Sequence, residues 1–317
     1  MDLRQLRYFT LVADLKSIAR ASAHLGIAAP AISRSIAALE EDLDCVLFER
    51  DGRGMRLIAA GEVLRGKSAA ILRDVEVARQ DVMAEGRHLA GHVGIGATPS
   101  VIALLGVALV KRSRAAFPKV RPRLAEGYSA YLQNWVLTGV VDFALVNGHR
   151  PSNARLECER LAVERLFAIE RPGGDGPPAD RVALSDLLEG PLLLPSARNP
   201  IRDLIDRAAE SLGRSAEVTL EVDSPSLLTQ LAAEGFARAV LPFAAVQEEV
   251  AAGKILARAI VEPAIRSDLN LIYLKDRPPS KVAAQVIRLM LEILEEIESS
   301  EKRHGFVEIC RPAKRRR

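Results

Sequence analysis

Apolar residues recur along residues 27–43 at the three- and four-residue spacing that places side chains on one face of a helix. Pro30 suits the first turn of such a helix, where a missing N–H leaves no hydrogen bond unmade. We expect the apolar face to be buried, and it consists of Ile32, Ile36, Leu39 and Leu43. The opposite face carries Pro30, Arg34, Ala37 and Glu41, with Ser33 on its flank.

Two more helices are predicted before this one. The first runs from Leu3 to Leu15 with an apolar stripe. Ser17 is a good N-cap for the second, Ile18–Leu25, and Gly26 permits a sharp turn into the Pro30 helix. Helix, tight turn and helix together predict a helix-turn-helix.

A hairpin is predicted after this motif. In the stretch ERDGRGMRL, Gly52 and Gly54 suit a tight turn between two short strands. Three cations, Arg50, Arg53 and Arg56, would make its tip basic. The pattern is typical of the wing that flanks a DNA-reading helix and contacts phosphates or the minor groove.

A single long helix is predicted from Ala60 to about Leu89, because the segment contains no proline. Apolar residues occupy the a and d positions of a heptad repeat, with Ser68 as the one polar interruption. They are Leu64, Ile71, Val75, Ala78 and Val82. We interpret them as the seam of a homodimer; the alternative is a helix packed onto its own domain.

From residue 90 onward, short apolar runs alternate with helical patterns, which predicts an α/β domain. Strands are expected at Val93–Ala97, Arg121–Glu126, Asp142–Val146, Leu166–Ile169, Leu192–Leu194, Val218–Val222, Ala239–Leu241 and Leu269–Leu274. Helices are expected at Pro99–Phe117, Ala130–Thr138, Pro200–Leu212, Pro225–Glu234, Phe243–Ala251 and Lys281–Glu298. The strands fall into two groups, so we expect two lobes, with the last strand and helix returning to the first.

The distribution of charge along the chain bears on the case for DNA binding. The formal net charge is +3, but residues 301–317 hold seven cations and two acids, a net of +5, which leaves −2 for residues 1–300. Bulk charge therefore does not argue for DNA binding, and the case depends on where particular side chains point. The Pro30 helix is itself polarised, since its acidic end (Glu40, Glu41, Asp42) would repel phosphate and leaves only its first half to approach DNA.

The residues described so far resemble the LysR-type transcriptional regulators. The resemblance is carried by MDLRQLRYF, by RASAHLGIAAPAISRSIAALEEDLDCVLFER, by the RGMRL wing and by Gly61, and it extends over about residues 1–300. It implies a winged helix-turn-helix, a dimerising linker helix and a two-lobed, periplasmic-binding-protein-like effector domain. One departure is Ala28-Ala29 in place of the usual Ser-Gln, which removes an amide that commonly reads a base edge.

We expect the chain to consist of four parts. Residues 1–58 are the DNA-binding domain and 59–89 the linker. Residues 90–300 are the effector domain, with lobe I at about 90–162 and 267–300 and lobe II at about 163–266. Residues 301–317 form a charged tail that we expect to be disordered.

The candidate DNA contacts lie on the reading face and in the wing. Base recognition should fall mainly on Pro30, Ser33 and Arg34, next to Ala29, while Arg20, Arg50, Arg53 and Arg56 hold the backbone. The alternative for each arginine is an ordinary solvated surface charge.

The candidate effector contacts surround three helix starts of one type, Thr98-Pro99, Asn199-Pro200 and Ser224-Pro225. Helix N-termini present free N–H groups beyond the strand ends of open α/β sheets, so a small anionic effector is expected. The residues predicted to contact it are Thr98, Ser100, Ser129, Asn147, Arg198, Asn199, Pro200, Arg202 and Ser224. The alternative for Thr98, Asn199 and Ser224 is ordinary capping.

Other motifs fail. GIGATP has Pro99 in place of the third glycine of a dinucleotide fingerprint, and His88 and His92 lack a third metal ligand nearby. Cys45, Cys158 and Cys310 are widely spaced, so we expect buried thiols; redox sensing by Cys158 is the alternative. We therefore expect no cofactor other than the effector and no enzymatic activity.

The expected protein is a cytoplasmic regulator, because no signal segment or membrane helix is evident. Its expected partners are double-stranded DNA, the effector, further copies of itself in a dimer or tetramer, and RNA polymerase. A solute-binding protein of a transport system and a metabolic α/β enzyme are the rival interpretations.

Overall fold

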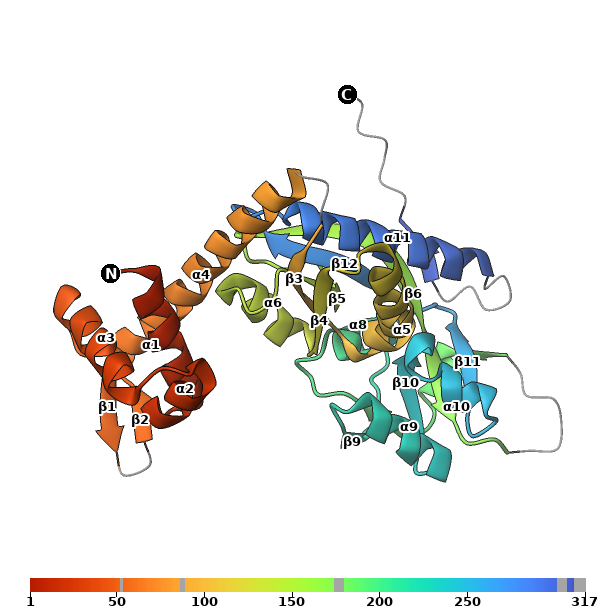
Figure 1. Ribbon diagram of the computed structural model, residues 1–317. Helices are drawn as coiled ribbons and strands as arrows, with labels where there is room; N and C mark the ends of the chain where they lie inside the picture. Colours follow the sequence, from red (N-terminus) through yellow and green to blue (C-terminus); the bar gives the residue numbers. More distant parts are fainter. Residues whose placement is uncertain (52–53, 86–88, 174–179, 301–306, 311–317) are drawn as a thin grey trace. The chain divides into compact units, whose positions relative to one another are not determined.

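The computed structural model describes residues 1–51, 54–85, 89–173, 180–300 and 307–310 (Figure 1). Its elements fall into two compact units, one running from α1 through α4 and one from β3 onward. Both the helix-turn-helix unit and the α/β unit follow the predicted order of elements.

The first unit begins with α1 (Leu3–Leu15), α2 (Ile18–Leu25) and α3 (Ala29–Asp42). Local chemistry fixes their ends. The Asp2 side chain accepts a hydrogen bond from the Gln5 backbone at 2.7 Å as half of a capping box, and Ser17 Oγ accepts from the Arg20 backbone at 3.3 Å. Gly26 adopts φ +66° and turns the chain into α3. The predicted helix-turn-helix is confirmed.

The buried face of α3 is one residue shorter than predicted. Ile32, Ile36 and Leu39 are buried with Phe9 and other apolar residues of α1 and α2. Leu43, however, is 36% exposed, so its predicted burial is wrong. The reason is that α3 ends at Asp42 and Leu43 is its C-cap, where the chain leaves the helix face.

The wing is a two-stranded antiparallel hairpin of β1 (Phe48–Asp51) and β2 (Gly54–Leu57). Gly54 adopts φ +136°, and a Cβ there would lie 2.5 Å from the Lys16 carbonyl oxygen. The close approach arises because the Met55 N–H donates to that same carbonyl at 3.0 Å. Glycine is therefore needed for the wing to pack against the turn between α1 and α2.

The linker helix α4 spans Ala59–Glu85. Leu89 lies outside it, so the predicted end at about Leu89 is too late. The first turns of α4 pack onto the head: Leu64 joins its apolar core and Ser68 is buried. Farther along, Val75 and Val82 are exposed. The first turns of α4 thus pack against their own unit, whereas its later turns leave apolar side chains exposed in this chain.

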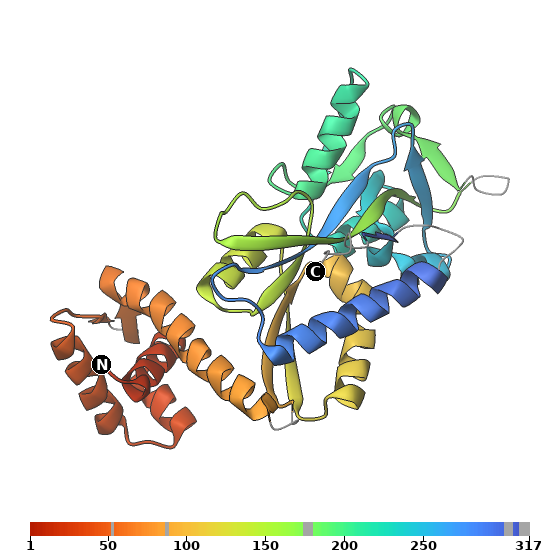
Figure 2. The ribbon, with the colours of Figure 1, turned by 90° about the horizontal axis from the view of Figure 1, so that it is seen from above.

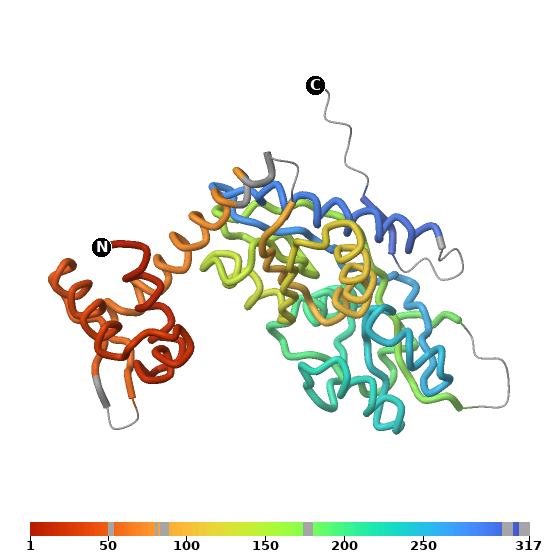
Figure 3. The backbone as a smooth tube through the Cα atoms, viewed as in Figure 1, coloured from red at the N-terminus to blue at the C-terminus, as the bar shows by residue number. Residues whose placement is uncertain are grey.

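The α/β unit contains a sheet in the order β4-β3-β5-β12-β6-β10-β8-β9. The strands are β3 (Gly91–Ala97), β4 (Val120–Glu126), β5 (Phe143–Asn147), β6 (Leu156–Glu170), β8 (Leu192–Leu194), β9 (Val218–Glu221), β10 (Arg238–Pro242) and β12 (Arg266–Leu274), with β7 (Arg181–Ala183), β11 (Leu256–Val261) and β13 (Val307–Ile309) off this path. In Figure 3 the chain passes from one lobe in yellow, through the other in green and cyan, and returns in blue.

One long strand, β6, belongs to both lobes. Its first part pairs with β12, and its last residues pair with β10 and β11, all antiparallel. The prediction of a strand only at Leu166–Ile169 missed the first ten residues. Glu157, Glu159 and Arg160 interrupt the apolar pattern there, because this part of the strand exposes charged side chains on its outer face.

Helices cover both faces of the sheet. Lobe I contains α5 (Pro99–Ala116), α6 (Ser129–Thr138) and α11 (Lys281–Ser300), and Figure 2 shows α11 in blue alongside α5. Lobe II contains α7 (Leu184–Leu187), α8 (Pro200–Ser211), α9 (Pro225–Glu234), η1 (Phe243–Ala245) and α10 (Gln247–Ala251). The single helix predicted for Phe243–Ala251 is wrong, since Val246 leaves the helical conformation between η1 and α10.

Disorder was expected for residues 301–317, but residues 307–310, the part of the tail that the structure describes, are ordered. Residues 307–309 form β13, which pairs antiparallel with β6, and Val307 is buried. The Ile309 N–H also donates to Glu298 Oε1 at 2.9 Å. Sheet hydrogen bonds and a buried valine order this segment, which the surrounding charge concealed; the cations of the tail lie outside the described residues.

Candidate functional site

The exposed face of α3 presents Pro30, Arg34, Ala37 and Glu41, and Ala29 and Ser33 are half-buried beside it. Among the described residues, Arg34 has no hydrogen-bond or ion-pair partner. Its guanidinium is therefore free to bind phosphate or a guanine edge.

The flanking arginines are less available. Arg20 donates to the Leu15 carbonyl at the end of α1, and Arg56 forms an ion pair with Glu49 across the hairpin. The side chain of Arg50 and all of Arg53 lie outside the described residues. Of the arginines predicted to hold the DNA backbone, Arg20 and Arg56 thus also have structural partners.

The acidic end of α3 has a structural role. Glu40 Oε1 accepts hydrogen bonds from the Leu47 and Phe48 backbones at 2.7 and 3.2 Å, and Asp42 pairs with the amino group of Met1 at 2.7 Å. These carboxylates hold the start of the wing and the N-terminus against α3. The reading surface stays confined to the first half of the helix.

The second candidate site is a cavity of about 410 Å³ in the α/β unit. Lobe I lines it with the start of α5, the start of α6 and the end of β5, and lobe II with the segments that lead into α8 and α9. Its polar lining residues are Thr98, Ser100, Tyr128, Ser129, Tyr131, Asn147, Ser196, Arg198, Asn199 and Asp223. Seven of the nine predicted effector residues are therefore brought together.

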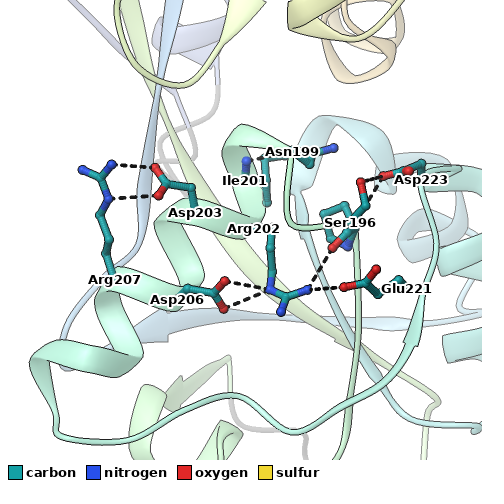
Figure 4. Close-up of polar contacts among 10 residues, drawn as sticks. Ser196, Asn199, Ile201, Arg202, Asp203, Asp206, Arg207, Glu221 and Asp223 are labelled. Carbon is teal, nitrogen blue, oxygen red and sulfur yellow. Dashed lines mark hydrogen bonds and ion pairs between the residues drawn. The ribbon is translucent and has the colours of Figure 1, made fainter.

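Arg202 and Ser224 lie outside this lining. Figure 4 shows Arg202 between Asp206 and Glu221, with its guanidinium 2.9 and 3.0 Å from their carboxylates. Ser224 caps α9 by accepting from the Leu227 backbone at 3.3 Å. We withdraw both as effector contacts, because Arg202 fastens α8 to β9 and Ser224 performs ordinary capping.

Capping accounts for Asn199 but not for Thr98. Asn199 Oδ1 accepts from the Ile201 backbone at 3.0 Å (Figure 4). Thr98, although it precedes α5, makes no side-chain cap. Its hydroxyl instead donates to Asn147 Oδ1, which ties the start of α5 to the end of β5.

Five buried polar residues form one network at the lobe I end of the cavity. Ser100 Oγ donates to Asn147 Oδ1 at 3.3 Å, alongside Thr98, and Ser129 Oγ donates to the Asn147 backbone oxygen at 3.0 Å. Asn147 Nδ2 in turn donates to Glu164 Oε2. The network fixes the orientation of each hydroxyl that lines this end.

Glu164 is the member of this network that sequence reasoning missed. It is buried on β6, and burial raises the pKa of its carboxyl to about 7, opposed by the Asn147 hydrogen bond. Its other oxygen, Oε1, has no hydrogen-bond partner among the described residues. The available signal was a lone acid in the apolar strand sequence LAVERLF.

The lobes approach each other beside this network. Gly148 adopts φ +95°, and a Cβ there would lie 2.4 Å from Cβ of Pro200 at the start of α8. Its N–H donates to the Asp268 carbonyl at 2.9 Å, and its carbonyl accepts from Asn270 Nδ2 at 2.8 Å. A side chain at position 148 would push the lobes apart, so this glycine keeps the cavity closed on one side.

Arg198 is the free cation of the cavity. It is exposed in the lining, and within the described part of the chain it has no hydrogen-bond or ion-pair partner. Asp223, another lining residue, is held by the backbone and hydroxyl of Ser196, both at 3.0 Å. Among the described lining residues, Arg198 is therefore the only uncompensated positive side chain that an anionic ligand would meet.

Metal binding, redox sensing and membrane insertion find little support in the described residues. In the described residues no group of three His, Cys, Asp or Glu side chains is placed to hold a metal ion, and His88 lies outside them. Burial raises the pKa of the Cys158 thiol, which disfavours the thiolate that redox sensing requires. No helix in the described ranges is long and apolar enough to cross a membrane.

A winged helix-turn-helix joined to a two-lobed, cavity-bearing domain defines a class of DNA-binding regulators that respond to small ligands. Family comparisons identify it further. "Bacterial regulatory helix-turn-helix protein, lysR family" matches residues 3–62, and "LysR substrate binding domain" matches residues 86–295. The chain belongs to the LysR family of transcriptional regulators.

Similar proteins also support the assignment to this family. The chain is 32% identical to the HTH-type transcriptional regulator BbuR of Bordetella bronchiseptica, over 86% of this chain and 83% of the relative. It is 32% identical to the nitrogen assimilation regulatory protein nac of Escherichia coli, over 92% and 94%. Both relatives are thus named as regulatory proteins.

The fold is shared with two full-length regulators. A variant of OxyR from Pseudomonas aeruginosa matches with a TM-score of 0.72 at 22% identity, over 92% of this chain and 94% of that one. CbnR in complex with its target DNA matches with a TM-score of 0.69 at 22% identity, over 93% and 99%.

Proposed function

We propose that this regulator binds a small anionic effector in the cavity between its lobes and thereby changes its binding to operator DNA. The observation that carries the proposal is the pairing of a free cation, Arg198, with a buried cluster of hydroxyl and amide groups across one cavity. A guanidinium suits a carboxylate or phosphate because its N–H groups bind two oxygens at once.

We further propose that Arg34, Ser33 and Pro30 read the operator, and that the exposed apolar residues of α4 join two chains. Arg34 supports the first part because it is exposed and free of partners in the described structure. Two reading heads allow one dimer to bind two half-sites one turn of DNA apart or a multiple of it. RNA polymerase is the proposed partner through which bound regulator alters transcription.

The DNA-binding part is tested with Arg34→Ala in the full-length protein. Loss of the guanidinium should weaken binding to DNA upstream of the chain's own gene by about 10- to 100-fold, corresponding to roughly 1–3 kcal/mol. Fluorescence anisotropy titrations at several salt concentrations provide the measurement. A phosphate contact would also lower the slope of log affinity against log salt by about one unit per head.

Arg65→Ala is the matched control. Arg65 is an exposed arginine of α4 that pairs with Asp14 at 2.9 Å, away from the reading face of α3. Its loss should leave affinity and salt slope unchanged. If Arg34→Ala behaved like this control, Arg34 would not be a DNA contact.

A further inference from the structure

We propose that Glu164, acting through Asn147, turns the hydroxyl groups at the lobe I end of the cavity into hydrogen-bond acceptors and so determines which effectors bind. The effector would then carry its carboxylate at Arg198 and a hydrogen-bond donor, such as a hydroxyl or ammonium group, at the Asn147 end. Hydroxy acids and amino acids meet this requirement, whereas dicarboxylates do not. The inference rests on the proposed effector site and specifies its ligand class.

Three hydroxyl groups at this end of the cavity already donate their hydrogens within the protein. A serine or threonine hydroxyl has one hydrogen to donate and two lone pairs that accept. Thr98 and Ser100 direct their hydrogens to Asn147 Oδ1, and Ser129 directs its own to the Asn147 backbone oxygen. What these three groups offer the cavity is therefore lone pairs, which bind a donor and repel a carboxylate.

Glu164 fixes that arrangement because an ionised carboxylate can only accept. The Asn147 amide must turn its NH₂ toward Glu164, and it does so. Its oxygen is then left facing Thr98 and Ser100, where it takes up their hydrogens. A protonated or amide side chain at position 164 could donate instead, which would let the Asn147 amide turn over and free the hydroxyl hydrogens for an anion.

Electrostatic repulsion from Glu164 also disfavours a ligand carboxylate at this end of the cavity. Glu164 is buried, and a ligand carboxylate at this end would add a second anion to a site with little water to screen it. A hydroxyl or ammonium group would not. The ionised form of Glu164 and a donor-bearing ligand therefore stabilise each other.

Among the described residues, no charged side chain is in position to neutralise Glu164. Ser267 on β12 and Val307 on β13 lie opposite it, and Asn147 on β5 is its hydrogen-bond partner. The charged neighbours on these strands pair among themselves: Arg165 and Arg266 with Glu308, and Arg160 with Asp268. Because burial raises the pKa of Glu164 to about 7, both of its protonation states are accessible near neutral pH.

The experiment uses three acids of matched chain length: γ-aminobutyrate, γ-hydroxybutyrate and succinate. Calorimetric titration of the full-length protein at about pH 8.5, where Glu164 is ionised, should show both donor-bearing acids binding roughly 10-fold or more tighter than succinate. Glu164→Gln should lose or reverse this preference. The unaltered protein at about pH 6 should shift the same way, which keeps the test decisive even if the variant folds poorly.

Two further variants separate the possible outcomes. Glu157→Gln, the same change near the other end of β6 and outside the cavity lining, should keep the wild-type preference. Arg198→Ala should weaken all three acids together. A preference that survives Glu164→Gln while Arg198→Ala weakens binding would overturn this inference and leave the effector site standing. Binding of no acid to any of the proteins would count against the site itself, and the inference would fall with it.

Discussion

Arg198 and Arg202 lie four residues apart, one just before α8 and one in its first turn, yet they have different surroundings. Arg202 is enclosed by Asp206 and Glu221 and holds α8 in place. Arg198 lines the cavity with its charge uncompensated by any described residue. At the residue scale, function follows from which cation the fold leaves without an anion, because a paired guanidinium has already committed its donors.

Replacing Arg198 by alanine should weaken binding of small carboxylates by about 10- to 100-fold, since charged hydrogen bonds contribute roughly 1.5–3 kcal/mol. The measurement is the shift in melting temperature as a carboxylate panel is titrated into the full-length protein. Arg207→Ala is the control, because Arg207 pairs with Asp203 at 2.9 Å on α8 and does not line the cavity. Equal shifts for both variants would exclude Arg198 as the anchor.

The early and the late turns of the linker helix α4 have different surroundings. Leu64 and Ser68 belong to the seam pattern by spacing, but they pack against the head of their own chain. Val75 and Val82, at 38% and 75% exposure, remain uncovered. Packing onto the helix's own domain thus accounts for the first turns, and the proposed dimer seam narrows to the later part of α4.

A charge placed on that later part should break the dimer. Val75→Lys would bury an unpaired ammonium in a two-helix seam, which costs several kcal/mol, whereas lysine at an exposed helix position is well tolerated. Sedimentation of the full-length protein should show dissociation at concentrations at least 10-fold higher than for wild type.

Val63→Lys supplies the comparison. Val63 is 66% exposed on the same helix but lies off the seam positions, so this variant should sediment as the wild type does. Dissociation caused by both changes, or by neither, would contradict a seam at Val75.

For the whole molecule, the proposed coupling between effector binding and DNA binding must act in both directions. If an acid that binds the cavity changes operator affinity by some factor, saturating operator DNA must change the affinity for that acid by the same factor. Couplings of this kind are typically about 5- to 150-fold. The two factors are measured by titrating DNA with and without the acid, and the acid with and without DNA.

Gly148→Ala tests where that coupling passes. The added Cβ would meet Pro200 and strain a left-handed backbone, so it should disturb the contact between lobes next to the cavity. We expect the coupling factor to fall toward one while operator affinity without the acid is retained. An unchanged factor would place the coupling elsewhere.

The sequence alone determined the elements whose patterns are local. The spacing of Ile32, Ile36 and Leu39, the cap at Ser17 and the turn at Gly26 predict the helix-turn-helix to within a residue or two, because each depends on neighbours a few positions away. The same holds for most strands and helices of the α/β unit, and for seven of the nine residues predicted to meet at the cavity.

Tertiary structure decided what depends on distant partners. Whether Arg198 or Arg202 is free, whether Thr98 caps a helix or binds Asn147, and whether Glu164 is buried depend wholly or in part on contacts between residues 17 to 49 positions apart. The strand at residues 307–309 exists because β6 offers it hydrogen bonds, which no local pattern announces. Periodicity records the direction in which a side chain points, while pairing, burial and charge compensation arise only when the chain is folded.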